Sequence, residues 1–263
     1  MPQDELQRWR WEAADARLQA RYLDVYKQAM LAMPRQGPGS PAFTQARIDQ
    51  VLRRLRPQRV LEVACGNGET ALLLAKRTDA QIIATDLHAP FIDKLRRAAK
   101  RQGLNHLETR CIGMDALDYP PASFDLIWAE GCAHLIGVER ALGLWRPLLS
   151  ADGLLFLSEP VWLTGAPSAA ARTFWHGNHP GMLGRDERES GFMQAGWRML
   201  ERSLLPAAAW RRYYAQLERV AAELAARYGA HHPALADIAG EAALYRAHGQ
   251  EYGLACWLLA AAR

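Results

Sequence analysis

The stretch Arg59–Asp86, RVLEVACGNGETALLLAKRTDAQIIATD, encodes two strands joined by a glycine-rich turn and a helix. The apolar residues Val60, Leu61 and Val63 are typical of a buried strand. Gly66 and Gly68 follow, where the chain must turn tightly and let a ligand approach its backbone. We expect Thr70 to cap a helix over 71–77. Asp86 ends the second strand eighteen residues after Gly68, the place where a βαβ nucleotide-binding unit holds ribose hydroxyls.

Two classes of ligand compete for this turn. A dinucleotide-binding unit has the spacing G-x-G-x-x-G, and Ala71 occupies the third position, which that motif tolerates. Glu62 argues against a dinucleotide, because a carboxylate would repel a pyrophosphate. It can instead accept hydrogen bonds through a loop that holds a cationic ligand. A glycine-rich turn without any ligand is the third alternative.

The composition is that of an ordinary globular protein. The chain has 263 residues, half of them apolar and 23% charged, with a net charge of +4. We expect one large domain, or a domain with an appended cap. No stretch is long and apolar enough to cross a membrane, and the first residues lack a signal-peptide pattern, so we expect a cytoplasmic protein. The cysteines at 65, 111, 132 and 256 have neither metal-ligand nor disulfide spacing, which predicts reduced thiols and no metal.

The rest of the chain alternates strands and helices, which predicts a doubly wound α/β sheet. A long helix over about 4–33 precedes the turn-rich loop RQGPGSP at 35–41, which on composition alone is a linker. A polar and aromatic loop is expected at 175–179. The further strands are expected at about 106–112, 124–128, 154–158, 197–205 and 252–262, and the further helices at about 44–55, 91–102, 139–149, 185–195, 207–228 and 234–247.

Reactive side chains are expected beyond the carboxyl ends of the strands, where ligands bind in open parallel sheets. Glu130 and His134 follow the fourth strand, which makes them candidates for reaction chemistry. Met114 and Asp115 follow the third strand. There Asp115 can accept a hydrogen bond from an adenine amino group while Met114 packs on the ring, or Asp115 can instead cap a helix.

These motifs resemble class I S-adenosylmethionine-dependent methyltransferases over about residues 45–205 and 252–262. Glu62 with the glycine turn is similar to their E-x-G-x-G-x-G signature, with Ala64 at the first glycine. Within this class the chain looks like the ubiquinone and menaquinone biosynthesis branch. The loop at 35–41, FDLIWAEG at 124–131, IGVER at 136–140, Trp145 and Ser158-Glu159 look like a little-characterised bacterial subgroup, whose usual tyrosine and asparagine are His134 and Leu135 here.

The resemblance implies a Rossmann-like seven-stranded sheet, mostly parallel, with helices on both faces. It implies an N-terminal helix and lid loop at 1–44, and a core at 45–263 with a helical insertion at about 206–250. The cofactor would be S-adenosylmethionine and the product S-adenosylhomocysteine. The residues implied to bind the cofactor are Arg35, Gln36, Glu62, Ala64, Gly66, Asn67, Gly68, Asp86, Leu87, Met114, Asp115 and Glu130.

The function expected is methyl transfer to a small-molecule acceptor by in-line displacement in a closed pocket. We expect His134 or Glu130 to orient or deprotonate the acceptor. Its pocket would be lined by Trp162, Trp175, His176 and His179, of which the tryptophans can equally be packing residues and the histidines polar loop residues.

Three other functions remain open at this point. RNA or protein methylation needs a basic stripe or a binding domain, and neither is visible, so nucleic acid is an unlikely partner. A non-catalytic S-adenosylmethionine-binding protein and a nicotinamide oxidoreductase are the others. The sequence is compatible with a monomer or a homodimer.

Overall fold

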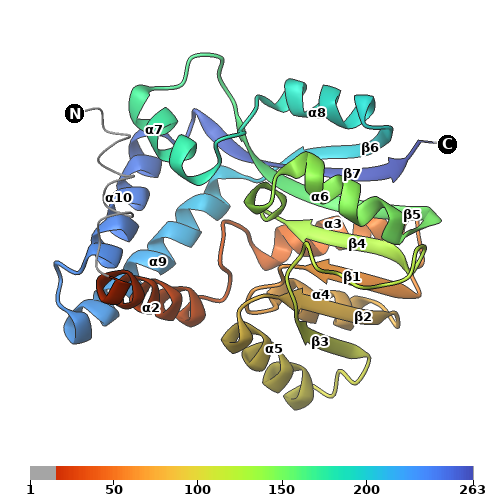
Figure 1. The fold of residues 1–263 in the computed structure, drawn as a ribbon, viewed down its shortest axis with the longest axis horizontal. Helices are drawn as coiled ribbons and strands as arrows, with labels where there is room; N and C mark the ends of the chain where they lie inside the picture. The colour runs from red at the N-terminus through yellow and green to blue at the C-terminus, as the bar shows by residue number, and fades with distance from the viewer. Residues whose placement is uncertain (1–15, 263) are drawn as a thin grey trace.

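A seven-stranded sheet forms the centre of the protein, in the order β3-β2-β1-β4-β5-β7-β6 (Figure 1). The computed structural model describes residues 16–262, and their side chains from residue 21. Strands β1 to β5 pair in parallel, and β7 runs antiparallel to both β5 and β6. The expected mostly parallel Rossmann-like sheet is therefore confirmed. The strands are β1 Arg59–Val63, β2 Gln81–Asp86, β3 Leu107–Cys111, β4 Phe124–Glu130, β5 Leu149–Trp162, β6 Trp197–Leu204 and β7 Tyr252–Ala261.

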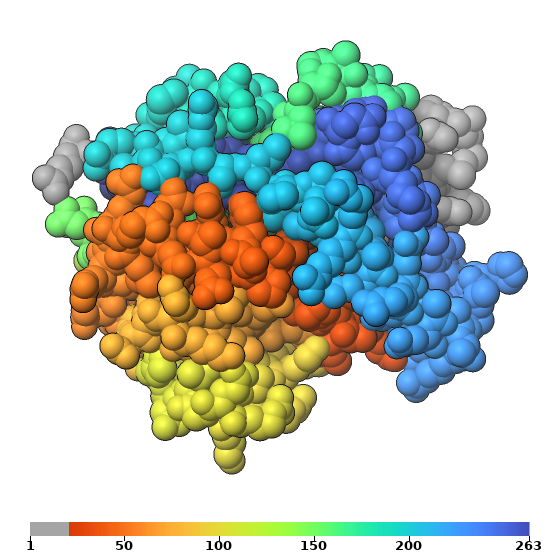
Figure 2. All heavy atoms as spheres, turned by 180° about the vertical axis from the view of Figure 1, so that it is seen from behind, coloured from red at the N-terminus to blue at the C-terminus, as the bar shows by residue number. Residues whose placement is uncertain are grey.

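Helices cover both faces of the sheet because successive strand residues bury alternate faces. On one face, Val60 packs with α3 (Pro41–Leu52), α4 (Glu69–Arg77) and α5 (Ala89–Arg101). On the other, Leu61 packs with α6 (Val138–Trp145) and α8 (Arg185–Gln194). Seen from behind, the orange segment that contains α3 lies between the amber α4 segment and the cyan β6 segment (Figure 2).

A third layer of helices lies beside the sheet. It consists of α2 (Ala16–Ala32), α7 (Ala169–Asn178), α9 (Ala207–Tyr228) and α10 (Pro233–His248). Their buried residues form one apolar cluster together with Tyr252 and Leu254 of β7. Figure 1 shows α2, α9 and α10 grouped at one end of the sheet. Among the described residues, no helix has the length and hydropathy needed to cross a bilayer.

Several local expectations were wrong, each for an identifiable reason. Helix α4 begins at Glu69, and its N-cap is Gly68 with a φ of 80°, so Thr70 lies inside the helix rather than capping it. Helix α3 begins at Pro41, because the hydroxyl of Ser40 accepts a hydrogen bond from the Phe43 amide.

The segment 175–179 is largely the last turn of α7 and not a loop. No helix begins at Asp115, so that residue caps none. The first half of the helix expected over 4–33 lies outside the described residues.

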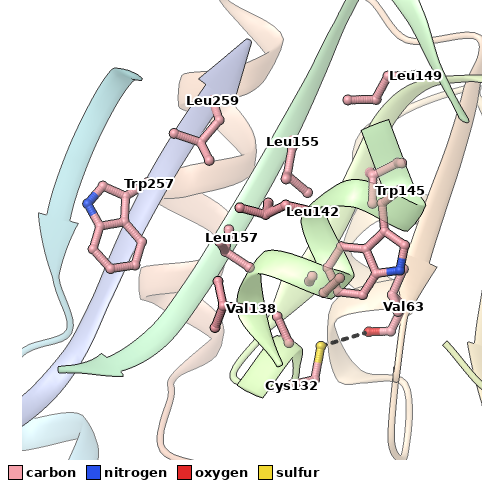
Figure 3. Packing of buried hydrophobic residues seen from close by; sticks show 14 of the residues in the cluster. Val63, Cys132, Val138, Leu142, Trp145, Leu149, Leu155, Leu157, Trp257 and Leu259 are labelled. Atoms are coloured by element: carbon pink, nitrogen blue, oxygen red, sulfur yellow. Dashed lines mark hydrogen bonds between the residues drawn. The ribbon is translucent and has the colours of Figure 1, made fainter. Parts of the chain in front are cut away.

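The apolar core between the sheet and α6 is continuous (Figure 3). Leu142 and Trp145 of α6 pack against Leu155 and Leu157 of β5 in this cluster. Leu142 is 4% exposed, whereas Leu144 on the same helix is 41% exposed. The two leucines are therefore a matched pair for mutation. The same substitution changes helix propensity equally at both positions but removes buried contacts only at Leu142.

We expect Leu142→Ala to lower the free energy of unfolding by about 2–5 kcal/mol, because it removes buried methyl groups and leaves a cavity. Leu144→Ala should change it by less than about 1 kcal/mol. Urea unfolding followed by tryptophan fluorescence measures both. Equal losses in the two variants would contradict the assigned packing of α6.

Candidate functional site

A cavity of about 640 Å³ lies between the carboxyl ends of the central strands and the helices of the third layer. Its walls come from the ends of β1, β2 and β4, from the segment 34–38 and from α2, α7, α9 and α10. Of the residues predicted from sequence, those that line it are Arg35, Gln36, Glu62, Ala64, Gly66, Asp86, Leu87, Met114, Asp115, Glu130, His134 and Trp175.

The glycine turn is covered by Gln36. Gly66 has a φ of 54°, and a Cβ built on it would lie 2.0 Å from the Gln36 side-chain oxygen. That oxygen accepts a hydrogen bond from the Asn67 amide at 2.8 Å, and the Gln36 amide group donates to the Met30 carbonyl at 2.9 Å. Ala64 has a φ of 52°, a left-handed conformation that is uncommon outside glycine. The turn is therefore built for close approach and has no room for a side chain at position 66.

The end of α2 is fixed against this turn by two side chains. The Asn67 side-chain amide donates to the Met30 and Leu31 carbonyls at 3.2 Å each. The Lys94 ammonium group donates to the Leu31 carbonyl at 2.6 Å. These donors satisfy carbonyls that a helix leaves free at its carboxyl end. Asn67 thus directs its side chain at α2, and it does not line the cavity.

Three acids, at the ends of three adjacent parallel strands, surround the turn. Glu62 of β1 is 4% exposed and one of its carboxylate oxygens has no hydrogen-bond partner. Burial raises its pKa well above the ordinary value, and the charges of Glu130 and Asp86 raise it further, while Arg35 lowers it. A buried carboxylate of this kind is stabilised by a cationic ligand.

Arg35 connects the segment 34–38 to two of the acids around the cavity. Its guanidinium donates to the Glu69 carboxylate at 2.8 Å and forms an ion pair with Glu130. The remaining Glu130 oxygen accepts from the Trp128 indole at 2.8 Å, with the Thr70 hydroxyl at 3.4 Å. Both oxygens of the Glu130 carboxylate therefore have partners within the protein.

Asp86 holds the turn from its other side. Its carboxylate accepts from the Gly66 amide at 2.9 Å and from the His88 amide at 2.8 Å. A carboxylate has about four lone-pair sites, so two backbone bonds leave acceptor capacity for a further donor.

An apolar wall follows Asp86. Leu87 and Leu135 line the cavity although they are 77% and 65% exposed. Met114 also lines the cavity, and its carbonyl accepts a hydrogen bond from the Trp145 indole at 3.0 Å. The adjacent carboxylate of Asp115 accepts from Arg140 at 3.3 Å. Exposed leucines inside a concavity are typical of a binding site for a flat apolar group.

His134 is oriented by a carboxylate that sequence reasoning did not single out as a site residue. Its Nδ1 lies 2.7 Å from the Glu159 carboxylate, which is fully buried and also accepts from the Ala133 amide at 2.8 Å. The position of Glu159 at the carboxyl end of the predicted fifth strand was the available signal. With Nδ1 donating to Glu159, Nε2 of His134 is the nitrogen with a free lone pair.

The other predicted acceptor residues separate into different environments. Trp175 lines the cavity, but Trp162 packs against the third-layer cluster. His176 is exposed on α7. His179 is buried behind His134, with ring centroids 4.7 Å apart, and its Nε2 has no partner.

The contribution of the third-layer helices to the cavity lining was not predicted residue by residue. It consists of aromatic residues and one carboxylate, from Tyr26, Phe174, Trp210, Tyr213 and Glu241. No sequence signal distinguishes these residues from ordinary residues at helical spacing.

Comparison with known proteins agrees with this geometry. Residues 60–153 match a family model described as a methyltransferase domain. The demethylmenaquinone methyltransferase of Thermus thermophilus is 33% identical over 124 residues, which cover 45% of this chain and 55% of that protein. The tRNA 5-carboxymethoxyuridine methyltransferase of Escherichia coli is 36% identical over 116 residues, 42% of this chain and 44% of that protein. The chain spans about half the length of these curated relatives.

Among solved structures, a S-adenosylmethionine-dependent methyltransferase from Geobacter sulfurreducens in complex with S-adenosylhomocysteine superimposes with a TM-score of 0.79. It covers 90% of this chain and 98% of its own, at 19% identity, so the likeness concerns the fold. The chain therefore has the class I S-adenosylmethionine-dependent methyltransferase fold and contains a methyltransferase domain at residues 60–153. The resemblance expected from the sequence, including that to the menaquinone branch, is confirmed.

Burial of His179 makes the stability of this region depend on pH. Burial, together with the neighbouring His134 and Arg188, lowers the pKa of His179 to about 4. Because the folded pKa lies below the unfolded value near 6.5, the unfolded chain binds more protons between these values. The free energy of unfolding should therefore fall as the pH drops from about 6.5 to 4.

We expect this fall to be smaller in His179→Gln than in the wild type, and unchanged in His176→Gln, whose imidazole is exposed. Urea unfolding at several pH values in this window measures the slopes. Equal slopes in wild type and His179→Gln would contradict the inferred state of the buried imidazole.

Proposed function

We propose that this protein transfers a methyl group from S-adenosylmethionine to a small-molecule acceptor bound in the cavity. The observation that carries the proposal is the buried, unpartnered carboxylate oxygen of Glu62 beside the glycine turn at Gly66. A cationic ligand that approaches the backbone there would neutralise this acid, whereas a pyrophosphate would be repelled. The match of residues 60–153 to a methyltransferase domain supports the same cofactor.

The residues around the cavity suggest where each part of the cofactor would bind. Glu62 and the turn at 64–68 would hold the methionine part, with Gln36 covering it. Asp86 would accept hydrogen bonds from the ribose hydroxyls through its remaining lone pairs. The adenine would lie against Leu87 and Met114, beside the Asp115 carboxylate. Asn67 and Gly68 would act through the shape of the turn.

The cofactor would supply a methyl group on a positively charged sulfur, so that an acceptor lone pair bonds to the methyl carbon and the sulfur leaves as a neutral thioether. What the chain contributes is alignment of the acceptor in a water-poor cavity, worth on the order of 7–11 kcal/mol in favourable cases. Arg35 supports this role, because its ion pairs with Glu69 and Glu130 hold the segment 34–38 over the site.

We assign the general base to His134 rather than to Glu130. His134 lines the cavity, and Nε2 is the ring nitrogen with a free lone pair because Nδ1 is engaged by Glu159. It can take the proton that an acceptor hydroxyl, thiol or ammonium must lose before or during attack. Glu130 is left the role of anchoring Arg35. Trp175 would contact the acceptor, whereas Trp162, His176 and His179 are not lining residues of the cavity.

Two alternatives are less well supported. RNA methylation is the activity that the name of the Escherichia coli relative describes. The cavity of this chain, however, is partly lined by third-layer helices and has six carboxylates and one arginine in its lining. Such a lining suits a small molecule better than a polyanion. A nicotinamide oxidoreductase would place a pyrophosphate beside Glu62. We place the protein in the reducing cytoplasm, in keeping with four unpaired cysteines among the described residues.

Calorimetric titration tests the cofactor. We expect S-adenosylhomocysteine to bind with micromolar affinity and NADH not to bind. Asp86→Asn should weaken S-adenosylhomocysteine binding by about tenfold or more, because hydrogen bonds to a charged acceptor are worth about 1.5–3 kcal/mol. Asp79→Asn is the control, since Asp79 is exposed at the opposite end of β2. Binding of NADH alone would contradict the proposed function.

The state of His134 can be tested before any acceptor is known. We expect long-range nitrogen–proton NMR to show the His134 tautomer with the proton on Nδ1 and none on Nε2. A proton on Nε2 would remove His134 as the base. With an acceptor found by screening, His134→Gln should lower kcat by about 10²–10⁴, whereas the exposed His176→Gln should not change it.

A further inference from the structure

The part of the cavity that the third-layer helices line combines one acid with aromatic rings. Glu241 lines it from α10, Tyr213 and Trp210 from α9, Trp175 from α7 and Tyr26 from α2. Tyr213 and Trp210 are 6% and 3% exposed, and Trp175 is 7% exposed. Four separate helices thus place a carboxylate and π-faces around the same space.

Glu241 lacks a cationic partner within the described part of the chain. Its carboxylate accepts one hydrogen bond, from the Tyr214 hydroxyl at 2.9 Å, and no lysine, arginine or histidine pairs with it. Burial raises the pKa of Glu241. Burial also raises the pKa of the neighbouring Tyr26 to about 12, with a further contribution from the charge of Glu241. Glu241 is only partly buried, but a carboxylate that is largely removed from water without a counter-charge is still costly for a residue that serves only packing.

The cavity as a whole has the same charge imbalance. The cationic side chains among its described lining residues are Arg35 and, when protonated, His134. Arg35 is already paired with Glu69 and Glu130, and His134 with Glu159. An anionic acceptor would therefore meet no free positive charge in the chamber, and would face the Glu241 carboxylate.

We propose that the chamber of Glu241, Tyr26, Trp175, Trp210 and Tyr213 is a binding site for a cationic amine, so that the methyl acceptor carries an ammonium group. The carboxylate supplies the counter-charge, and the aromatic faces attract a cation through their quadrupoles. That the bound amine is the methyl acceptor rests on the proposed function. The amine-binding site itself is defined without that function. The amine bound by Glu241 can be the group that is methylated or a second group that positions the molecule.

The test compares two ligands of similar shape, one charged and one neutral. Phenethylamine and 2-phenylethanol are titrated into the protein by calorimetry, with and without S-adenosylhomocysteine, at about pH 8, where an alkylamine stays protonated. We expect phenethylamine to bind at least about tenfold more tightly than 2-phenylethanol. Choline against 3,3-dimethyl-1-butanol repeats the comparison with a smaller pair.

Glu241→Gln identifies the residue responsible. The glutamine side chain retains an oxygen that can accept the Tyr214 hydroxyl but has no charge. We expect the preference for the amine to fall to about threefold or less. Glu223→Gln, at an exposed position of α9, should retain the full preference, and a thermal melt of each variant confirms folding.

Three outcomes would overturn the inference: equal binding of the amine and the alcohol, no binding of either amine, or an amine preference that survives in Glu241→Gln. Its failure is distinguishable from that of the proposed function. If the wild type binds S-adenosylhomocysteine but has no amine preference, only the amine site is wrong. If it prefers the amine but does not bind S-adenosylhomocysteine, the site stands and methyl transfer does not.

Discussion

The crowding of negative charge at the carboxyl edge of the sheet is the constraint on which the site depends. Parallel pairing of β1 with β2 and β4 brings Glu62, Asp86 and Glu130 to one edge, and their mutual repulsion adds to the cost of burying Glu62. Arg35 supplies one compensating charge from the segment 34–38. The same ion pairs that reduce the repulsion also hold this segment over the glycine turn. The position of the segment therefore depends on the charge balance among the acids. A cationic cofactor would complete the balance that Arg35 begins.

The cavity has two parts with different physical characters. Near the turn, positions are fixed by hydrogen bonds between backbone and side chains, such as those of Gln36 and Asp86, which define a rigid and specific shape. In the chamber around Glu241, aromatic rings on four helices provide the walls. His134 also lines the cavity, oriented by the buried Glu159 carboxylate. This arrangement would place proton transfer at the junction where cofactor and acceptor meet.

Sequence patterns predicted the sheet well, because strand periodicity and the glycine turn are local signals. Most of the residues predicted to bind the cofactor line one cavity, since parallel strands align their carboxyl ends. The failures have physical causes. Thr70 was expected to cap α4, but the left-handed Gly68 takes that position, and the segment 175–179 extends a helix that is capped from Ser168. Glu241 could not be predicted, because its role depends on how α10 packs against α2 and α9. The anchoring of α2 by Asn67 could not be predicted for the same reason. The carbonyls that its side chain contacts lie 34 to 37 residues earlier in the chain.

A crystal structure of the protein with S-adenosylhomocysteine would test the central claim most directly. Our account predicts the amino-acid part beside Glu62 and Gly66, the ribose hydroxyls on Asp86, the adenine against Leu87 and Met114, and the sulfur directed toward His134 and the aromatic chamber. A ligand bound elsewhere, or one bound in the cavity with its sulfur directed away from His134, would contradict the account.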